Sequence, residues 1–169
     1  MEPGERNRSL SGAGAVAAAG NLYTAYTLGS SYDIYVARSF DGGETWSSRR
    51  VDNTSGRYVA NLNPSLAVSP DGIVAVVWAD SRRSNWVFPP PYVMPSWLGY
   101  RDDFAVFLGI SFDQGGTFEN YKVSEFPRGN YEFFPTVTFS GTLDLFMAWQ
   151  GLNQGNNNVY FKQGSPAPR

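Results

Sequence analysis

A repeated phrase constrains the fold of this chain more than any other feature. The eight residues SFDGGETW at positions 39–46 recur as SFDQGGTF at positions 111–118. The two copies begin at Ser39 and Ser111, which are 72 residues apart. Internal self-similarity is typical of architectures that stack one supersecondary unit several times. We therefore expect a repeat protein.

A second pattern places three units in one frame. In each unit, a proline or glycine lies fourteen residues before a large aromatic residue. The pairs are Gly12 and Tyr26, Pro64 and Trp78, and Pro135 and Trp149. The first pair is the weakest match, because alanine and glycine dominate the sequence around it.

The units have the sequence character of β-structure. Short runs rich in β-branched and aromatic residues alternate with turn sequences such as SPDG, DGGE and NQGNNN, without sustained helical periodicity. Four runs make a full unit, and repeated four-stranded antiparallel units are typical of β-propeller blades. We predict a single all-β domain over 1–169, a partial or half propeller. Its blades are expected at about 11–53, about 61–124 and, incompletely, about 132–164.

The repeated phrase falls at the turn between the third and fourth strands of a blade. Glycine allows a tight reversal there, and an aspartate can accept hydrogen bonds from its own turn. The phrase fits S-x-D-x-G-x-T-W, so the chain resembles the sialidase-like (Asp-box, BNR-repeat) β-propellers; DIYVARS and WADSR also resemble them. The matching residues are Ser39, Asp41, Gly43, Thr45 and Trp46, then Ser111, Asp113, Gly115, Thr117 and Phe118. The resemblance implies a structural role for them, on the face opposite the active site.

The second unit departs from the repeat by an insertion. Trp78 and Phe107, the aromatic residues of its second and third strands, are 29 residues apart, whereas Tyr26 and Tyr35 are 9 apart. We place the inserted loop at 80–103. Insertions in repeat proteins map to loops on one face, often the binding face.

The inserted loop combines aromatic residues, prolines and arginines. Prolines hold a loop extended, so the aromatic side chains can stack on a sugar or fill a partner's pockets. The candidate ligand- or partner-binding residues are Trp86, Phe88, Tyr92, Trp97, Tyr100, Arg82, Arg83 and Arg101. The alternative is a lid that folds back over its own blade.

The third unit lacks a fourth strand, and three blades do not close a ring of about four to eight. In one reading, two copies close a six-bladed ring and the N-terminal segment 4–11 supplies the closing strand. In another, the chain is an excerpt of a longer protein, or a different subunit covers its edge. A monomer with a blunted edge is the third reading.

Composition excludes several kinds of chemistry. The chain has no histidine or cysteine, so no Ser-His-Asp or Cys-His catalysis, disulfide or Cys/His zinc site can form. Its formal charge of −2, without a basic run, argues against nucleic-acid or anionic-membrane binding. We predict no cofactor and no metal site; calcium at Asp102, Asp103 and 156–158 is a weak alternative, because the ligand spacing is absent.

The function is predicted less sharply than the fold. The resemblance implies a glycoside hydrolase with an arginine triad, a tyrosine nucleophile and an aspartate acid/base, but no FRIP-like arginine segment is present and Asp80 lies in the insertion. We assign no catalytic residue. We expect a non-catalytic module that assembles with copies of itself or another subunit, with the insertion as contact surface. The first alternative is a carbohydrate-binding module, and the second, less favoured, is a sialidase-type glycoside hydrolase. The family favours an extracellular or cell-surface location, although the sequence shows no clear signal peptide.

Overall fold

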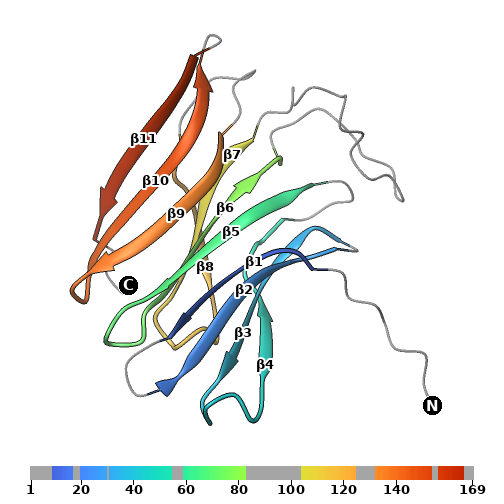
Figure 1. Ribbon diagram of the computed structural model, residues 1–169, viewed down its shortest axis with the longest axis vertical. Coiled ribbons are helices and arrows are strands. Elements are labelled where there is room, and N and C mark those ends of the chain that lie inside the picture. Colours follow the sequence, from blue (N-terminus) through green and yellow to red (C-terminus); the bar gives the residue numbers. More distant parts are fainter. Residues whose placement is uncertain are drawn as a thin grey trace.

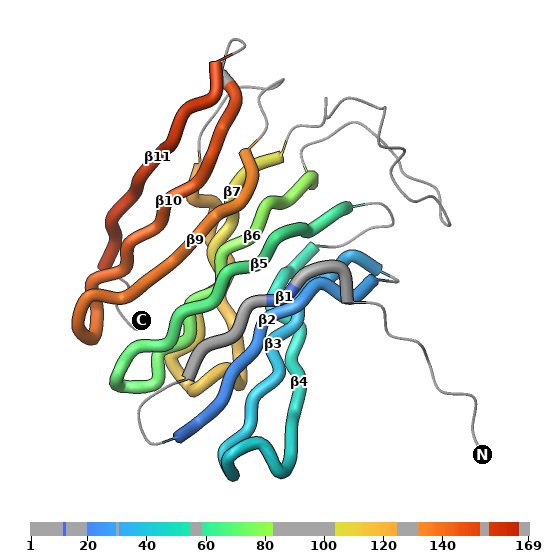
Figure 2. The backbone as a smooth tube through the Cα atoms, in the orientation of Figure 1, coloured from blue at the N-terminus to red at the C-terminus, as the bar shows by residue number. Residues whose placement is uncertain are grey.

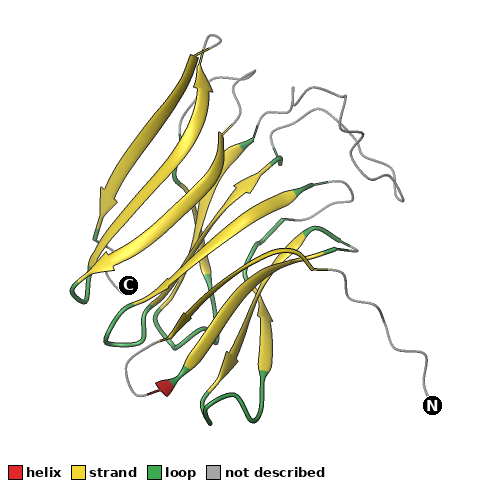
Figure 3. Ribbon diagram, viewed as in Figure 1, coloured by secondary structure: helices red, strands yellow, loops and turns green. Residues whose placement is uncertain are grey.

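The computed structural model describes residues 9–16, 20–29, 31–54, 59–82, 104–124, 132–153 and 156–165, and every structural statement below concerns these residues. They form eleven strands in three antiparallel sheets, with no α-helix (Figures 1 and 3). The structure thus confirms an all-β fold with the organisation of a partial propeller.

Each sheet is a simple meander, in which consecutive strands pair with one another. Blade 1 contains β1 (Ser9–Val16), β2 (Leu22–Leu28), β3 (Asp33–Ser39) and β4 (Ser47–Arg50). Blade 2 contains β5 (Asn61–Val68), β6 (Val74–Asp80), β7 (Ala105–Ser111) and β8 (Glu119–Lys122). Blade 3 contains β9 (Glu132–Ser140), β10 (Asp144–Asn153) and β11 (Asn156–Gly164).

Blade 2 lies between blade 1 and blade 3 (Figure 1). The first strands of successive blades are neighbours: β1 contacts β5, and β5 contacts β9 (the latter pair is followed in Figure 2). The fourth strands, β4 and β8, are the outermost in their sheets. This order is that of blades arranged side by side around an axis near their first strands.

The segment 4–11 is only partly described. Residues 9–11 belong to β1, which pairs with β2 in blade 1. Residues 4–8 lie outside the described residues, so a closing role for them stays a prediction.

The repeat frame corresponds to register positions in the sheets. The two aromatic residues of each blade face each other across the second and third strands and stack, with ring centroids 5.8–6.2 Å apart. The pairs are Tyr26 with Tyr35, Trp78 with Phe107, and Trp149 with Tyr160. The second-strand aromatic residue of each pair is the one that ends the fourteen-residue spacing, and in blade 1 the other end of that spacing, Gly12, is the register partner of Tyr26.

The repeated prolines mark an irregularity in the first strand. The register between β5 and β6 shifts between Leu62 and Ser65, on either side of Pro64. Asn63 and Phe134, which precede Pro64 and Pro135, have φ angles of 53° and 51°. Because proline has no N–H to donate to a ladder, a bulge is where a strand tolerates it.

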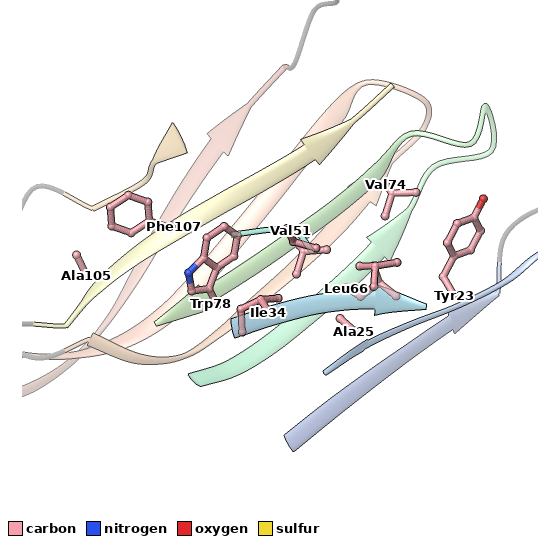
Figure 4. Close-up of a cluster of buried hydrophobic side chains, with 11 residues drawn as sticks. Tyr23, Ala25, Ile34, Val51, Leu66, Val74, Trp78, Ala105 and Phe107 are labelled. Carbon is pink, nitrogen blue, oxygen red and sulfur yellow. The ribbon is translucent and has the colours of Figure 1, made fainter. Parts of the chain in front are cut away.

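The hydrophobic core lies between the blades. Each blade has a leading face, toward the next blade in the chain, and a trailing face, toward the preceding one. The first junction joins Tyr23, Ala25, Ile34, Val36 and Val51 of blade 1 to Leu66, Val74, Val76, Trp78, Ala105 and Phe107 of blade 2 (Figure 4). The second joins Ala75, Val77, Val106, Leu108 and Val123 of blade 2 to Val137, Leu145, Met147 and Trp149 of blade 3.

This arrangement explains why the strands differ in sequence pattern. Both β6 and β7 are buried at all seven positions, because blade 2 is covered on both faces, and they read as continuous apolar runs. In β2, buried and partly buried positions alternate, because within the described chain only the leading face of blade 1 is covered. The number of buried positions in a strand therefore depends on whether one or both faces of its sheet are covered by a neighbouring blade.

The tight junction gives a stability prediction. A Cβ atom added at Gly109 of β7 would lie 2.5 Å from Val51 Cγ1 and 3.2 Å from Trp78 Cζ3. We expect Gly109→Ala to lower the free energy of unfolding by about 1–3 kcal/mol, because an overpacked junction must shift. Urea denaturation measures this change. The control is Gly164→Ala at the end of β11, where a Cβ meets nothing within 4 Å; equal effects of the two substitutions would contradict the packing.

Candidate functional site

The insertion lies almost wholly outside the described residues. Of its eight predicted binding residues only Arg82 is described. The others, Arg83, Trp86, Phe88, Tyr92, Trp97, Tyr100 and Arg101, stay sequence predictions, as do Asp102 and Asp103. The structure does describe the two points at which the insertion joins blade 2.

Arg82 is held in place on three sides. Its Nε and Nη2 donate to both carboxylate oxygens of Asp80, at 2.7–3.0 Å, and its Nη1 donates to Asn53 Oδ1 at 2.9 Å. The guanidinium also lies over the ring of Phe107, 3.9 Å from the centroid. Asp80 is fully buried and accepts Trp78 Nε1 at 3.1 Å as well. This arginine therefore ties the start of the insertion to blade 2 and, through Asn53, to the connection from blade 1.

The other root of the insertion is apolar. Phe104 is buried in a cluster with Ala60 and Ala79, and its ring lies 4.8 Å from that of Phe133 in blade 3. Both ends of the inserted loop are thus fixed at the same end of the blades. Because strands 2 and 3 are antiparallel, this end is opposite the turns that carry the repeated phrase.

A buried carboxyl group joins blades 2 and 3 at the same end. Glu132 Oε1 accepts Trp149 Nε1 at 3.1 Å, and Oε2 accepts the Val106 amide at 3.2 Å. Burial raises the pKa of Glu132, and hydrogen bonds from Ser124, Trp149 and Val106 offset only part of the rise. In blade 2 the corresponding partner of Trp78 Nε1 is Asn61 Oδ1, at 3.2 Å. These polar groups satisfy indole donors that the core would otherwise leave unpaired.

The two copies of the repeated phrase form matching turns. In the first, Asp41 accepts Ser39 Oγ (2.7 Å), the Thr45 amide (2.9 Å) and Thr45 Oγ1 (2.5 Å). The Gly43 amide donates to Ser39 Oγ at 2.8 Å, and the φ angle of Gly43 is 100°. These hydrogen bonds hold the pKa of Asp41 well below its usual range.

The second turn repeats this network. Asp113 accepts Ser111 Oγ (2.7 Å), the Thr117 amide (2.8 Å) and Thr117 Oγ1 (2.9 Å). Burial of Asp113 tends to raise its pKa, but the hydrogen bonds from Ser111, Thr117 and Gly116 outweigh it and lower the pKa to about 2. The Gly115 amide donates to Ser111 Oγ at 2.7 Å.

The last residue of the phrase differs between the copies. Trp46 Nε1 donates to the Gly43 carbonyl at 3.0 Å, and about half of this side chain is exposed. Phe118 packs against the core between blades 1 and 2. The ten motif residues of the two phrases form hydrogen bonds within their own turns or pack against the core. None of these contacts indicates a ligand site.

An uncovered apolar face is the feature that the sequence prediction missed. The leading face of blade 3 carries Val159 and Phe161, whose relative exposures are 82% and 65%. Phe146 extends it, with its ring 5.8 Å from that of Phe161. The equivalent residues are buried in the other blades: Ile34 and Val36 in β3, and Val106 and Leu108 in β7. The frame set by the aromatic pairs aligns Val159 and Phe161 with those positions, so the sequence marks the face as apolar but does not show whether a blade covers it.

The described residues offer neither a metal site nor a membrane span. No group of three or more Asp, Glu, His or Cys residues among them could hold a metal ion. The asparagines 156–158, suggested as weak calcium ligands, are exposed on β11. No helix within the described ranges is long and apolar enough to cross a bilayer.

Comparison with known proteins supports the fold alone. No protein-family model and no curated protein matches the chain. Among solved structures, the Hadza microbial sialidase Hz136 aligns with a TM-score of 0.60 and 17% identity, over 91% of this chain and 35% of that one. The Penicillium chrysogenum α-L-arabinanase, solved with arabinobiose, aligns with a TM-score of 0.56 and 16% identity, over 97% of this chain and 51% of that one.

The chain therefore has the blade arrangement of a β-propeller, and in fold it is similar to these glycoside hydrolases, as the repeated phrase led us to expect. It spans about a third of the sialidase and about half of the arabinanase. At these identities the likeness extends to the arrangement of the blades and not to an activity.

The hydrogen bonds of the second turn predict a pH-dependent effect. We expect Asp113→Ala to lower the free energy of unfolding at pH 7, because the substitution removes the hydrogen bonds that Asp113 accepts in the turn. The loss should be only about 1 kcal/mol, because the carboxylate is exposed and water competes for the same hydrogen bonds. The folded-state pKa of Asp113 is about 2, below the ordinary value of 3.8, so this stabilisation is present above pH 3.8 and is lost as the pH falls toward 2. Urea denaturation at pH 7 and pH 2.5 tests both statements.

The control for this prediction is Asp71→Ala, at an exposed aspartate in the turn between β5 and β6. A loss of stability as large in Asp71→Ala as in Asp113→Ala would count against the turn network. So would a difference between wild type and Asp113→Ala that did not shrink in acid.

Proposed function

We propose that this chain is a non-catalytic propeller module that works by assembly, with copies of itself or with another subunit. The observation that carries the proposal is the exposed leading face of blade 3, with Val159 82% and Phe161 65% exposed. The corresponding faces of blades 1 and 2 are each covered by the next blade. A face with the same apolar positions as those covered elsewhere in the chain is suited to packing against another blade.

Burial of the apolar side chains on this face would stabilise an assembly. Full burial of a valine or phenylalanine side chain is worth about 1.5–3 kcal/mol relative to exposure. Val159 and Phe161 lie beside Phe146 and Ala148, which are partly exposed on the same face. Contiguous apolar patches of this kind mark interaction sites in soluble proteins.

An open strand edge accompanies the face. Among the described residues β11 pairs only with β10, whereas the third strands β3 and β7 each pair with a fourth strand. An unpaired edge of nine residues is a template for further strand pairing. The edge and the apolar face lie on the same strand and favour the same kind of partner.

The described carboxylates support a structural reading over a catalytic one. Asp52, Asp80 and Glu132 are buried, and each is occupied by protein donors. Asp52 pairs with Arg50 and accepts the Ile34 amide, Asp80 pairs with Arg82, and Glu132 accepts Trp149 Nε1. Buried carboxylates in folded proteins are normally paired or hydrogen-bonded in this way, so these contacts favour a structural role for the three residues.

In this proposal the insertion is a second contact surface. Its aromatic residues come from the sequence, and its two roots, at Arg82 and Phe104, are anchored in the fold. Anchored roots fix where such a loop emerges from blade 2.

The open face gives a prediction for the mass in solution. We expect the wild-type chain to form a species heavier than its 18.6 kDa, measured by light scattering over a range of concentrations. Phe161→Asp should shift the mass to that of one chain, because a charge cannot be buried in an apolar contact without a partner.

The control is Leu143→Asp, at an exposed leucine in the turn between β9 and β10 of the same blade. It should leave the mass unchanged. A wild-type mass of one chain at every concentration, or equal effects of the two substitutions, would contradict assembly through the blade 3 face.

The insertion gives a separate prediction. Trp86→Ala and Trp97→Ala should weaken assembly, seen as a lower average mass at a fixed concentration, without any binding of the wild type to a glycan array. Glycan binding by the wild type that either substitution abolishes would instead favour a carbohydrate-binding module.

A further inference from the structure

We propose that Glu132 is a proton-controlled latch between blades 2 and 3. Its carboxyl group is neutral when the two blades are packed together, and release of its proton loosens their junction. The junction lies between two blades of the described chain. It therefore exists whatever covers the outer faces of blades 1 and 3, and whether or not the chain assembles.

Donors from both blades converge on this carboxyl group. Glu132, the first residue of β9, has a relative exposure of only 1%. Its Oε1 accepts the indole N–H of Trp149 in blade 3. The Val106 amide of blade 2 is shared between Glu132 Oε2, at 3.2 Å, and Ser124 Oγ, at 2.9 Å, and the Ser124 side chain also hydrogen-bonds to the carboxyl group. These three donors are neutral groups.

Blade 2 satisfies the corresponding indole in a different way. Trp78 Nε1 donates to Asn61 and to Asp80, and Asp80 forms a salt bridge with Arg82. Trp78 and Trp149 are 71 residues apart, and the same offset aligns Asn61 with Glu132, Asp80 with Gly151 and Arg82 with Asn153. In blade 3 the buried acid therefore comes from the first strand, and an asparagine occupies the position of the arginine.

An acid in this setting favours its neutral form. Ionising a buried carboxyl group is costly unless a close cation compensates the charge. Burial is the largest effect on Glu132 and raises its pKa. The hydrogen bonds from Ser124, Trp149 and Val106 lower it by less, and the charge of Lys122 in β8 lowers it least.

The other charged groups on the surrounding strands are engaged or lie at the far end. Strands β5 and β7 carry no charged side chain. Asp80 of β6 is paired with Arg82, and Asp144 lies at the opposite end of β10, where its register partner is Ser140. Glu119 of β8 accepts Tyr121 Oη, and Lys162 of β11 donates to the Val123 carbonyl.

The sign of the pH effect follows from the raised pKa. Below the ordinary value of 4.5, Glu132 is protonated in both the folded and the unfolded chain, and the junction has its full strength. Above 4.5 the unfolded chain releases this proton first. The folded state is then disfavoured by about tenfold per pH unit, until the folded carboxyl group ionises as well. Acid therefore tightens the latch.

The latch lies beside one root of the insertion. Phe133, the next residue after Glu132, has its ring 4.8 Å from that of Phe104, where the insertion rejoins blade 2. Val106, which donates to Glu132, is two residues beyond Phe104. Release of the proton should thus loosen the end of the blades from which the insertion emerges.

The first test compares the wild type with Glu132→Gln, which keeps an acceptor for Trp149 Nε1 but cannot ionise. Urea denaturation between about pH 4.5 and pH 8 gives the unfolding equilibrium constants. The ratio of the wild-type constant to that of Glu132→Gln should rise about tenfold per pH unit above 4.5 before it levels off. The matched control is Glu44→Gln, at an exposed glutamate, which should keep the pH profile of the wild type. Parallel profiles of wild type and Glu132→Gln overturn the latch.

The second test is made on the wild type, so it holds even if Glu132→Gln does not fold. The indole N–H resonance of Trp149, assigned by its loss in Trp149→Phe, should shift with pH around a midpoint above 4.5. Hydrogen exchange of the backbone amides, corrected for its intrinsic pH dependence, should increase more in β9 and β10 than in β2 and β3 as the pH rises. A midpoint at or below 4.5 overturns the latch, and so does an equal increase of exchange in all three blades.

Discussion

The structure depends on one constraint: a four-stranded sheet has two faces, and the described chain covers an apolar face only by stacking another sheet on it. Trp78 and Phe107 are buried because Ile34 and Val36 of the preceding blade lie against them. Val106 and Leu108 on the other face of the same sheet are buried by blade 3. Stability is therefore a property of junctions between neighbouring blades, as in other repeat proteins. The open faces at the two ends follow from the same rule.

The two ends of the blades differ in their polar contacts. At one end, the repeated phrase closes the turn between the third and fourth strands with hydrogen bonds from the turn's own residues, and Arg38 of blade 1 also donates to the Gln114 carbonyl of the second copy at 2.7 Å. At the other end, polar groups reach between blades: Arg82 joins Asp80 to Asn53, and Glu132 joins Trp149 to Val106. The insertion emerges from this second end. The insertion thus joins blade 2 where the blades are already tied together.

Much of the fold was predictable because its determinants are local. The turn residues, the alternation in β2 and the spacing from Pro64 to Trp78 depend on the backbone of one blade, and each recurs in the sequence. The candidate site was less predictable. Arg82 was singled out for ligand binding, but its donors engage Asp80 and Asn53, and Asn53 is 29 residues away in the chain. The sequence shows that Val159 and Phe161 are apolar but not that they are exposed, because exposure depends on what packs against a strand.

The sequence by itself determined the unit: four short strands, an aspartate-closed turn and an aromatic pair, all set by propensity, glycine positions and side-chain periodicity. Only the tertiary structure decided which faces of those units are covered. Val36, Leu108 and Phe161 occupy the same position in three blades, yet the first two are buried and the third is 65% exposed. The physical reason is that burial is a relation between sheets. A strand's residues specify which face is apolar, and the presence of a neighbouring blade decides whether that face meets protein or water.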